Sequence, residues 1–503
     1  MIRFLLVSIL FFSMGLLEAQ TVRFPFPHHT SYAGTYIKPS NYTQDELDRQ
    51  TEAFYDAWKK KYLKVGCKPD QYYVWFEDGN TMTVSEGMGY GMVIVPLMAG
   101  YDPDAKKYFD GLNHFYLAHP SHIMHHLMAW KQVKGCKDAD GPDSATDGDM
   151  DIAFGLLLAY VQWGDTTYLN EAKRMIADIE GENRKEGDIN QDLSSVKLGD
   201  WVTDPGVYMN STRTSDFIMD HFRVFSEASG DTLLWNNVID TCYALINKIQ
   251  TQYSPQTGLL PDFIIHLAKN PEPAYPNFLE SKLDGNYSYN ACRDPWRITN
   301  DYLLNGDIRA RKAVLKISRW LYESTGGSVN KITAGYYLTG KKAVYWSDMA
   351  FTAPFTVGAM LDTANQEWLN KLYARVLLSK VSSGGYYDNT LKLLSLITLS
   401  GNYWAPPKEV INAVNPVRKP KNIFRIYPTM TSRKVNVKVL SKNTGKNTQI
   451  AVFCLTGKKL FQESLTTVLS QGIDFSDYRK GIYLVTLLAP NGKPLAVQKI
   501  IKY

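Results

Sequence analysis

Ser144-Ala-Thr-Asp-Gly-Asp-Met-Asp-Ile-Ala153 is the stretch from which the fold of this chain is best approached. It places Asp147, Asp149 and Asp151 at alternate positions before an apolar run that ends near Trp163. Acidic and hydroxyl residues before an apolar run are typical of a helix N-terminus, where backbone N–H groups attract negative charge. One helix cap needs fewer acids, so the surplus is free to face a cleft or a sugar. The spacing resembles a calcium loop, but the sixth-position Gly and twelfth-position Glu are missing, which argues against calcium.

The composition describes a large exported protein. The chain has 503 residues, enough for two or more domains. Its net charge is +5, and 13% of its residues are aromatic. Arg3, an apolar run to Leu17 and a small residue at Ala19 predict a signal peptide over residues 1–19. No later stretch approaches the roughly 20 apolar residues that span a bilayer. We therefore expect an exported protein with no membrane span in its mature form.

Residues 20–404 and 424–503 differ in hydrophobic period. Apolar residues recur every three or four positions in 44–63, 86–99, 151–163, 168–180, 232–250, 307–323 and 385–400, which predicts about a dozen helices arranged as hairpins in a ring or in a bundle. Residues 405–423 are rich in Pro and basic residues, as a linker is. From Phe424 the period becomes two, in 434–440, 449–453, 481–487 and 495–501, which predicts a small β-sandwich.

The charge of the C-terminal region is uneven, because no acid occurs from Val410 to Gln462. Nucleic acid is a poor partner for an exported protein, so a solvated basic surface is the expected reading, with an anionic glycan or envelope contact as the alternative. The five cysteines show no Cys-x-x-Cys, and their pairing stays open. Cys454 is expected to be a small buried apolar residue.

Five histidines cluster between residues 114 and 126, in a stretch that we interpret as a helix ending at Trp130. His122 and His126 have the i, i+4 spacing of a metal pair, but no third ligand is evident. Polar packing is the favoured reading, so we expect no metal and no cofactor. No Gly-x-Ser-x-Gly, phosphate-binding loop or dinucleotide fingerprint occurs.

Two further stretches carry candidate chemistry. In Ser85-Glu-Gly-Met-Gly-Tyr-Gly-Met92, Glu86 opens an apolar helix beside small residues that let a ligand or another backbone come close. Its carboxyl group is either a capping group or, if buried, a general acid with a raised pKa. The segment 278–297 crowds acids, amides, aromatic rings and two arginines into a stretch without period, which is typical of a functional loop.

These three stretches, in their order along the chain, resemble glycoside hydrolase family 8 over residues 22–404. The first motif is Ala145-Thr-Asp-Gly-Asp-x-x-Ile-Ala-x-Gly-Leu-Leu-x-Ala-x-x-x-Trp163, with Gly155 where the family prefers Ser or Ala. The others are Ser85-Glu-Gly-Met-Gly-Tyr-Gly91 and Tyr289-x-x-x-Arg293-x-Pro-Trp-Arg297. The resemblance implies an (α/α)6 barrel and inverting endo-hydrolysis of a β-1,4-linked polysaccharide.

The same resemblance implies roles for individual residues. Glu86 matches the general acid, and Asp147 matches the acid at the central sugar. The implied substrate contacts are aromatic platforms and central-subsite residues, namely Trp130, Trp201, Tyr289 and Arg293.

Asn290 departs from the pattern, because many members carry Asp there as the general base. An amide cannot accept a proton from water at neutral pH, so the base must lie elsewhere. The chain resembles a branch that includes chitosanases and lichenases, in which Asn stands there and a nearby loop supplies a Glu. Glu280 is the predicted base, with Glu272 and Asp284 in reserve. An inverting enzyme needs such a base about 6.5–9.5 Å from its acid, with water between.

The C-terminal region resembles the sorting domain of type IX secretion cargo, on Ile426-Tyr-Pro428, Leu455-Thr-Gly457 and Lys480-Gly-Ile-Tyr-Leu-Val485. This implies contact with export machinery and secretion or attachment at the cell surface.

The leading hypothesis is a monomeric, exported endo-β-1,4-glycanase. Its expected substrate is a cellulose-type or mixed-linkage β-glucan, then chitosan, then xylan. A chitosan cleft needs extra carboxylates, for which Asp149, Asp216 and Asp284 are candidates. The alternatives are a glycan-binding protein that has lost its base at Asn290, and a polysaccharide lyase, against which both acid motifs argue.

Overall fold

The computed structural model describes residues 22–181, 186–412, 424–427, 430–439, 448–454, 458–464, 470–489 and 494–503. The predicted signal peptide and most of the predicted linker lie outside these residues. The chain divides into two compact units, Met1–Ala413 and Val414–Tyr503. No helix in the described ranges is both long enough and apolar enough to cross a bilayer.

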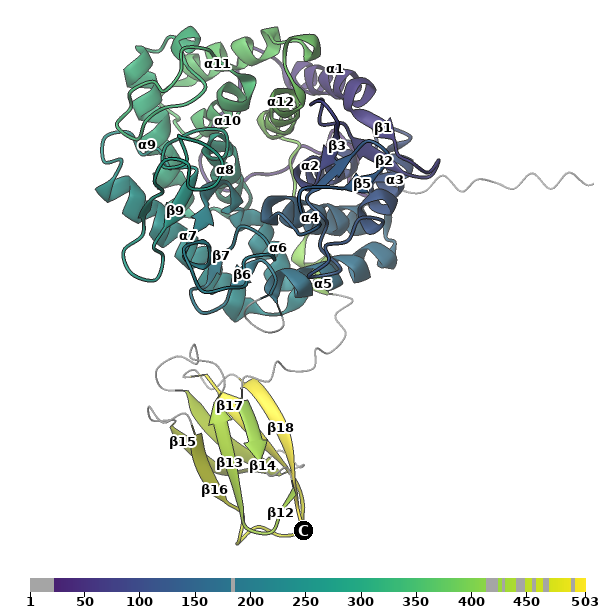
Figure 1. Ribbon diagram of the computed structural model, residues 1–503, viewed down its shortest axis with the longest axis vertical. Helices are drawn as coiled ribbons and strands as arrows, with labels where there is room; N and C mark the ends of the chain where they lie inside the picture. Colours follow the sequence, from purple (N-terminus) through teal and green to yellow (C-terminus); the bar gives the residue numbers. More distant parts are fainter. Residues whose placement is uncertain are drawn as a thin grey trace, which may run out of the picture. The chain divides into compact units, whose positions relative to one another are not determined.

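The described part of the first unit is a closed ring of helices with short strands in its connecting loops (Figure 1). The helices are α1 (Gln44–Tyr62), α2 (Ser85–Leu97), α3 (Ala105–Leu117), α4 (Thr146–Trp163), α5 (Thr166–Glu180), α6 (Met219–Ser229), α7 (Thr232–Gln252), α8 (Asp294–Asn305), α9 (Ile308–Thr325), α10 (Met349–Ala359), α11 (Gln366–Leu378), α12 (Tyr386–Leu399) and α13 (Lys408–Asn412). The strands are β1 (Leu63–Val65), β2 (Tyr72–Val74), β3 (Thr81–Val84), β4 (Lys131–Val133), β5 (Lys137–Asp138), β6 (Ile189–Asn190), β7 (Ser195–Val196), β8 (Thr212–Arg213), β9 (Phe263–Ile265) and β10 (Glu272–Pro273).

Inner and outer helices alternate around this ring. The inner helices α2, α4, α6, α8, α10 and α12 are buried along most of their length. For α2, α4 and α10 this is expected, because they are apolar on every side. The inner helices α2, α4, α6, α8 and α10 each pack on the outer helix that follows in sequence, and α12 packs on α1. The outer helices are amphipathic: α1 buries Leu47, Phe54 and Trp58 on one face, and its N-terminus carries a capping box formed by Thr43 and Glu46. The predicted (α/α)6 barrel is confirmed.

The close packing of α2 against α4 depends on glycine. A Cβ atom at Gly155 would lie 2.7 Å from the carbonyl oxygen of Met92, and one at Gly89 would lie 2.6 Å from Cβ of Asp151. These contacts leave no room for a side chain at either glycine. The departure at Gly155 therefore brings the two inner helices together at the height of the acidic motif.

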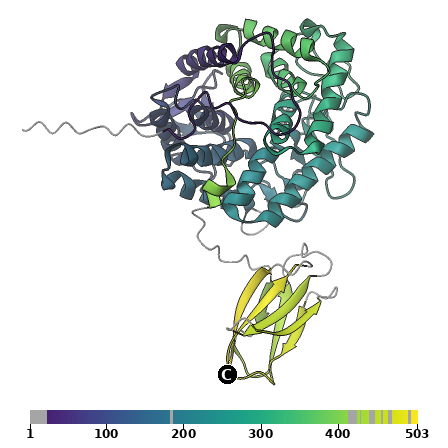
Figure 2. The same cartoon turned by 180° about the vertical axis from the view of Figure 1, so that it is seen from behind.

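The N-terminal segment crosses one end of the barrel, which Figure 2 shows from behind. Its backbone N–H groups bond to carbonyl groups at or near the C-terminal ends of five inner helices: Arg23 to Gln162, Phe26 to Ala99, Thr30 to Gly401, Ala33 to Leu303, and Ile37 to Met360. This segment closes the floor of the barrel. The N-termini of the inner helices therefore face the opposite, open end.

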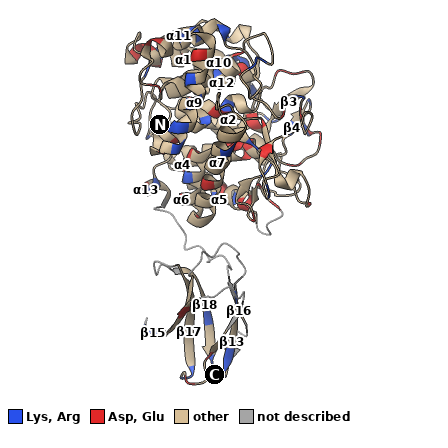
Figure 3. Ribbon diagram, turned by 90° about the vertical axis from the view of Figure 1, so that its left-hand side faces the viewer, with Lys and Arg blue, Asp and Glu red and all other residues tan. Residues whose placement is uncertain are grey.

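The second unit packs two sheets around one core. Its strands are β11 (Phe424–Tyr427), β12 (Met430–Thr431), β13 (Lys434–Val439), β14 (Gln449–Cys454), β15 (Lys459–Ser464), β16 (Ser470–Asp474), β17 (Gly481–Leu488) and β18 (Pro494–Lys502). The sheet orders are β11-β13-β16 and β12-β18-β17-β14-β15. In β13, Val435 and Val437 are buried while Lys434 and Lys438 are exposed. Figure 3, in which Lys and Arg are blue, shows basic residues on this strand. The predicted all-β domain is confirmed, although Cys454 is only partly buried.

Two details differ from the sequence-based predictions. The stretch that holds His119, His122 and His126 is not helical, because α3 ends at Leu117 before Pro120, and proline disfavours a continuing helix. Residues 408–412, which we assigned to the linker, form α13 and pack against α6.

Candidate active site

Glu86 lies at the first turn of α2, at the open end of the barrel. Its Oε1 accepts a hydrogen bond of 2.9 Å from the Tyr386 hydroxyl, and its Oε2 accepts one of 2.9 Å from Arg293 Nη1. The side chain is 16% exposed. Burial raises the pKa of Glu86 to about 7, against the opposing effect of the Arg293 charge. A large fraction of this carboxyl group is therefore protonated at neutral pH.

Arg293 is the buried centre of the site. Beyond Glu86, it donates hydrogen bonds to Asp147 Oδ2 at 2.7 Å, Ser215 Oγ at 2.8 Å, Asn290 Oδ1 at 2.9 Å and the Tyr90 hydroxyl at 3.2 Å. Its guanidinium group joins residues from α2, α4 and the 280–293 segment, which are far apart in sequence.

Asp147 keeps its charge in this setting. Burial acts to raise the pKa of its carboxyl group, but the charges of Arg293 and Arg213 outweigh burial and hold that pKa below its usual value. The site therefore holds one carboxyl group that stays protonated up to neutral pH and one that stays ionised.

Glu280 is bonded to the same group of residues from the other side. Its Oε1 accepts a hydrogen bond of 2.8 Å from Arg213 Nη2, and its Oε2 accepts one of 2.8 Å from Asn290 Nδ2. The side chain is 44% exposed. Asn290 thus bridges Glu280 to Arg293, and Arg293 reaches Glu86.

The two reserve acids have other contacts. Asp284 is fully buried, and its carboxylate accepts hydrogen bonds from the backbone N–H groups of Leu279, Glu280 and Ser281, so it orders the turn that presents Glu280. Glu272 Oε1 lies 2.8 Å from His266 Nδ1, within hydrogen-bond distance, on a partly exposed surface.

Aromatic side chains flank these acids. The Trp130 carbonyl group accepts a hydrogen bond from the Ser85 N–H, which places Trp130 beside the start of α2. Trp201 is partly buried and packs edge-on against Tyr208. Tyr289 is 42% exposed, donates its hydroxyl hydrogen to Asp348 and accepts a 3.3 Å hydrogen bond from Trp346 Nε1. Partly or largely exposed flat rings of this kind suit the faces of sugar rings.

The other two acids of the Asp147 motif face inward. Asp149 is fully buried and accepts a hydrogen bond of 2.9 Å from the Met128 N–H. Asp151 forms a two-pronged ion pair with Arg297, with distances of 2.7 and 2.6 Å. The other two acids of this motif therefore lie in the barrel interior rather than facing the cleft.

Several residues that shape the site were not predicted. Asp262 is buried, and its Oδ1 accepts hydrogen bonds from the backbone N–H groups of Ser288, Asn290 and Ala291. Tyr386 holds Glu86, and Arg213 holds Glu280. The position of Tyr386 at the start of the last inner helix was the available signal for that residue.

The histidines have separate polar partners. His122 Nδ1 lies 2.7 Å from the Pro142 carbonyl oxygen, and His126 pairs with Glu171 at 3.3 Å. No group of three or more His, Cys, Asp or Glu side chains is arranged to hold a metal ion among the residues that the structure describes. A disulfide joins Cys67 to Cys136.

One protonated and one ionised carboxyl group lie beside partly exposed aromatic rings at the open end of a helical barrel. This arrangement is suited to cleaving a glycosidic bond. The class that this architecture defines is the glycoside hydrolases. A profile described as "Glycosyl hydrolases family 8" matches residues 48–401, and the chain belongs to this family.

Two proteins of similar sequence and one solved structure support the assignment to this family. A "Beta-glucanase" of Niallia circulans is 44% identical, covering 76% of this chain and 91% of that protein. An "Endoglucanase" of Bacillus sp. (strain KSM-330) is 38% identical, covering 76% and 82%. The apo structure of a β-1,3-1,4-glucanase from Paenibacillus sp. X4 is 44% identical, with a TM-score of 0.73, covering 76% of this chain and 99% of that one. The protein is therefore an O-glycosyl hydrolase.

A second profile, described as "Secretion system C-terminal sorting domain", matches residues 425–503. The predicted sorting domain is confirmed, and the protein is secreted or held at the cell surface.

Proposed function

We propose that this protein cleaves internal β-1,4 linkages of a β-glucan with inversion at the anomeric carbon. Glu86 acts as general acid and Glu280 as general base. The observation that carries the proposal is the run of hydrogen bonds from Glu86 through Arg293 and Asn290 to Glu280, since it gives two far-separated carboxyl groups one common support.

The protonation states suit these roles. Burial raises the pKa of Glu86 to about 7, so the group can deliver a proton to the leaving glycosidic oxygen near neutral pH. Glu280 accepts two hydrogen bonds, from the Arg213 guanidinium and the Asn290 amide, which hold its carboxyl group in place. Its exposed fraction leaves the carboxylate within reach of a water molecule.

Asp147 completes the mechanism. Its ionised carboxylate favours the positive charge that develops on the central sugar ring as the bond breaks. Water that has lost a proton to Glu280 attacks the anomeric carbon on the face opposite the leaving group. Trp130, Trp201 and Tyr289 are the proposed contacts to sugar rings, and Asn290 and Arg293 are the proposed polar contacts.

A neutral glucan is favoured over chitosan. Asp149, Asp216 and Asp284, the acids that we expected to bind ammonium groups, are each fully buried. The two relatives and the solved structure that are at least 38% identical bear glucanase names, and the structure is a β-1,3-1,4-glucanase. We therefore rank mixed-linkage β-glucan first, carboxymethylcellulose second, and chitosan and xylan after them.

The test is a substrate panel of these four polymers with the wild type beside Glu86→Gln, together with NMR of the first products. We expect sugar release from β-glucan, its loss in the variant, and reducing ends that appear first as the α-anomer. Initial β-anomer would contradict inversion, and faster release from chitosan than from β-glucan would contradict the substrate.

A further inference from the structure

Two aromatic side chains at the open end of the barrel have no role in the proposed mechanism. Tyr345 and Trp346 lie in the loop that leads into the N-terminus of the inner helix α10. Glu86 and Asp147 lie at the same end of the barrel, in the first turns of α2 and α4. Tyr345 is 94% exposed and Trp346 is 56% exposed. Exposed apolar surface beside a cleft is typical of ligand-binding grooves. We call these two residues the rim platform.

A line of contacts joins the rim platform to the buried centre of the site. The Arg293 guanidinium carbon lies 6.0 Å from the centre of the Tyr387 ring. The Tyr387 hydroxyl donates a 2.6 Å hydrogen bond to the Tyr289 carbonyl oxygen. Trp346 Nε1 in turn donates a 3.3 Å hydrogen bond to the Tyr289 hydroxyl oxygen. Exposure increases along this line, from the buried Arg293 through Tyr289 to Trp346, so the rim platform is continuous with the cleft.

The Trp346 ring is held in place although it is exposed. Its carbonyl oxygen accepts a 2.9 Å hydrogen bond from the Ala334 N–H, and its indole N–H bonds to Tyr289. Tyr289 is itself fixed, because its ring packs edge-on against Phe351 at 5.1 Å and its hydroxyl donates to Asp348. The polar atom of the indole is therefore satisfied within the protein, while more than half of the side chain stays open. A ring positioned in advance loses little conformational freedom when a ligand binds.

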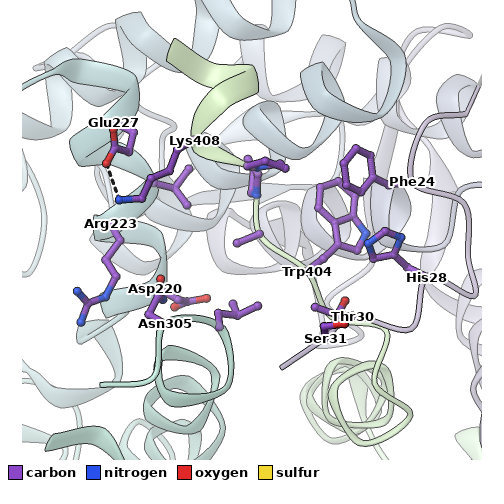
Figure 4. A pocket seen from close by; sticks show the side chains of 15 residues that line it. Phe24, His28, Thr30, Ser31, Asp220, Arg223, Glu227, Asn305, Trp404 and Lys408 are labelled. Carbon is purple, nitrogen blue, oxygen red and sulfur yellow. Dashed lines mark ion pairs between the residues drawn. The ribbon is translucent and has the colours of Figure 1, made fainter. Parts of the chain in front are cut away.

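The aromatic rings at the closed end of the barrel are arranged differently. A cavity of about 350 Å³ lies there, and Phe24 and Trp404 are among the residues that line it (Figure 4). These two rings stack on each other with their centres 4.8 Å apart, and Trp404 is only 2% exposed. Trp404 therefore offers no open face to a ligand, whereas Trp346 does.

We propose that the rim platform is an additional sugar-binding subsite, which extends the cleft and holds a glucose unit of the polymer remote from the cleaved bond. This inference rests on the proposed function and names a further part of the substrate that the chain contacts. The face of a glucose ring that carries C–H groups is apolar and stacks on an indole ring, while its hydroxyl groups stay in water. Continuity with the cleft favours the glucan over a protein partner, because a polymer bound at Tyr289 reaches Trp346 with its next units.

The experiment measures the binding of cellotriose and cellohexaose by calorimetry, in the full chain carrying Glu86→Gln so that neither sugar is cleaved. Adding Trp346→Ala should weaken cellohexaose binding about five- to tenfold, as is typical for the loss of an aromatic anchor. Cellotriose fits within the central part of the cleft, so its affinity should not change. Tyr345→Ala should show the same dependence on length with a smaller loss, about twofold, because fewer contacts hold that ring.

Two further variants separate stacking from other effects. Trp346→Phe keeps a flat ring but removes the hydrogen bond to Tyr289, and it should retain most of the affinity for cellohexaose. Tyr322→Ala is the matched control, because this ring is 37% exposed but belongs to the outer helix α9. The control should bind both sugars as the parent protein does.

The subsite is overturned if Trp346→Ala binds cellohexaose as tightly as the parent protein. An equal loss for both sugars would also overturn it, since Trp346 would then act on the centre of the cleft through Tyr289. Equal losses in Trp346→Phe and Trp346→Ala would assign the effect to the hydrogen bond rather than to stacking, with the same consequence. If the parent protein binds neither sugar, the proposed function fails together with this inference, whereas an unaffected Trp346→Ala overturns this inference alone.

Discussion

Replacing Glu280 by Gln is the sharpest test of the proposed mechanism. Gln keeps the size of the side chain but cannot accept a proton from water. Removing a general base lowers the rate about 10²–10⁴-fold, which corresponds to about 2.7–5.5 kcal/mol in the barrier. We therefore expect kcat on β-glucan to fall by this factor.

The fold should survive this change. The Glu280 side chain is 44% exposed but Arg213 is only 11% exposed, so their pair is not a fully screened surface pair. The introduced Gln can still accept a hydrogen bond from Arg213, so losing the charge should cost no more than about 1–3 kcal/mol. Arg213 keeps a second acidic neighbour in Asp216, at 3.6 Å. Asn290 and Arg293 retain their mutual hydrogen bond, so KM and the melting temperature should change little.

The assay compares reducing-sugar release by Glu280→Gln with that by Glu272→Gln. Glu272 is a matched control, because it is 40% exposed and also pairs with a basic side chain. The control should keep wild-type activity. A loss of less than about tenfold in Glu280→Gln would refute the assignment of the base. A large loss in the control alone would transfer the role to Glu272.

Three more predictions follow from single features of the structure. A general acid at Glu86 must be protonated, and burial raises its pKa to about 7. We therefore expect kcat/KM to fall about tenfold per pH unit above that value. A pH profile that stays flat through this range would contradict the role of Glu86 as general acid. Gly155→Ala should destabilise the barrel by about 1–3 kcal/mol in urea unfolding, since its Cβ would meet the Met92 carbonyl group, whereas Gly206→Ala, with open space around it, should not. Replacing Cys67 and Cys136 by Ser should cost about 2–5 kcal/mol, measured by thermal unfolding under oxidising conditions, and an unchanged melting temperature would count against a stabilising disulfide.

The sequence predicted the parts of the fold that depend on local pattern. The helices expected at 86–99, 151–163 and 385–400 are α2, α4 and α12, because long apolar periods leave little choice of structure. The ring itself came from the family resemblance, since period alone allowed a bundle. The error at residues 118–130 arose because the histidine spacing was given more weight than Pro120.

The contacts within the site were less accessible from sequence. Asp262 and Arg213 lie at least 28 residues from Asn290, and only the closed ring brings them to it or to its partner Glu280. The sequence also did not show which partner each acid of the Asp147 motif contacts. Alternate spacing on a helix turns neighbouring side chains about 200° apart, so Asp147 and Asp149 reach different partners. Which of them faces Arg293 depends on packing against α2.

The neighbours of Asn290 explain why an amide rather than a carboxylate stands at this position. Its Nδ2 lies 2.8 Å from Glu280 Oε2 while its Oδ1 accepts a hydrogen bond from Arg293. An aspartate at this position would place a second carboxylate against Glu280, and two carboxylates so close do not both ionise readily. An amide instead donates a hydrogen bond to Glu280. If the base is supplied from residue 280, the residue at 290 has to donate a hydrogen bond, so the loss of the usual aspartate and the gain of Glu280 are one change rather than two.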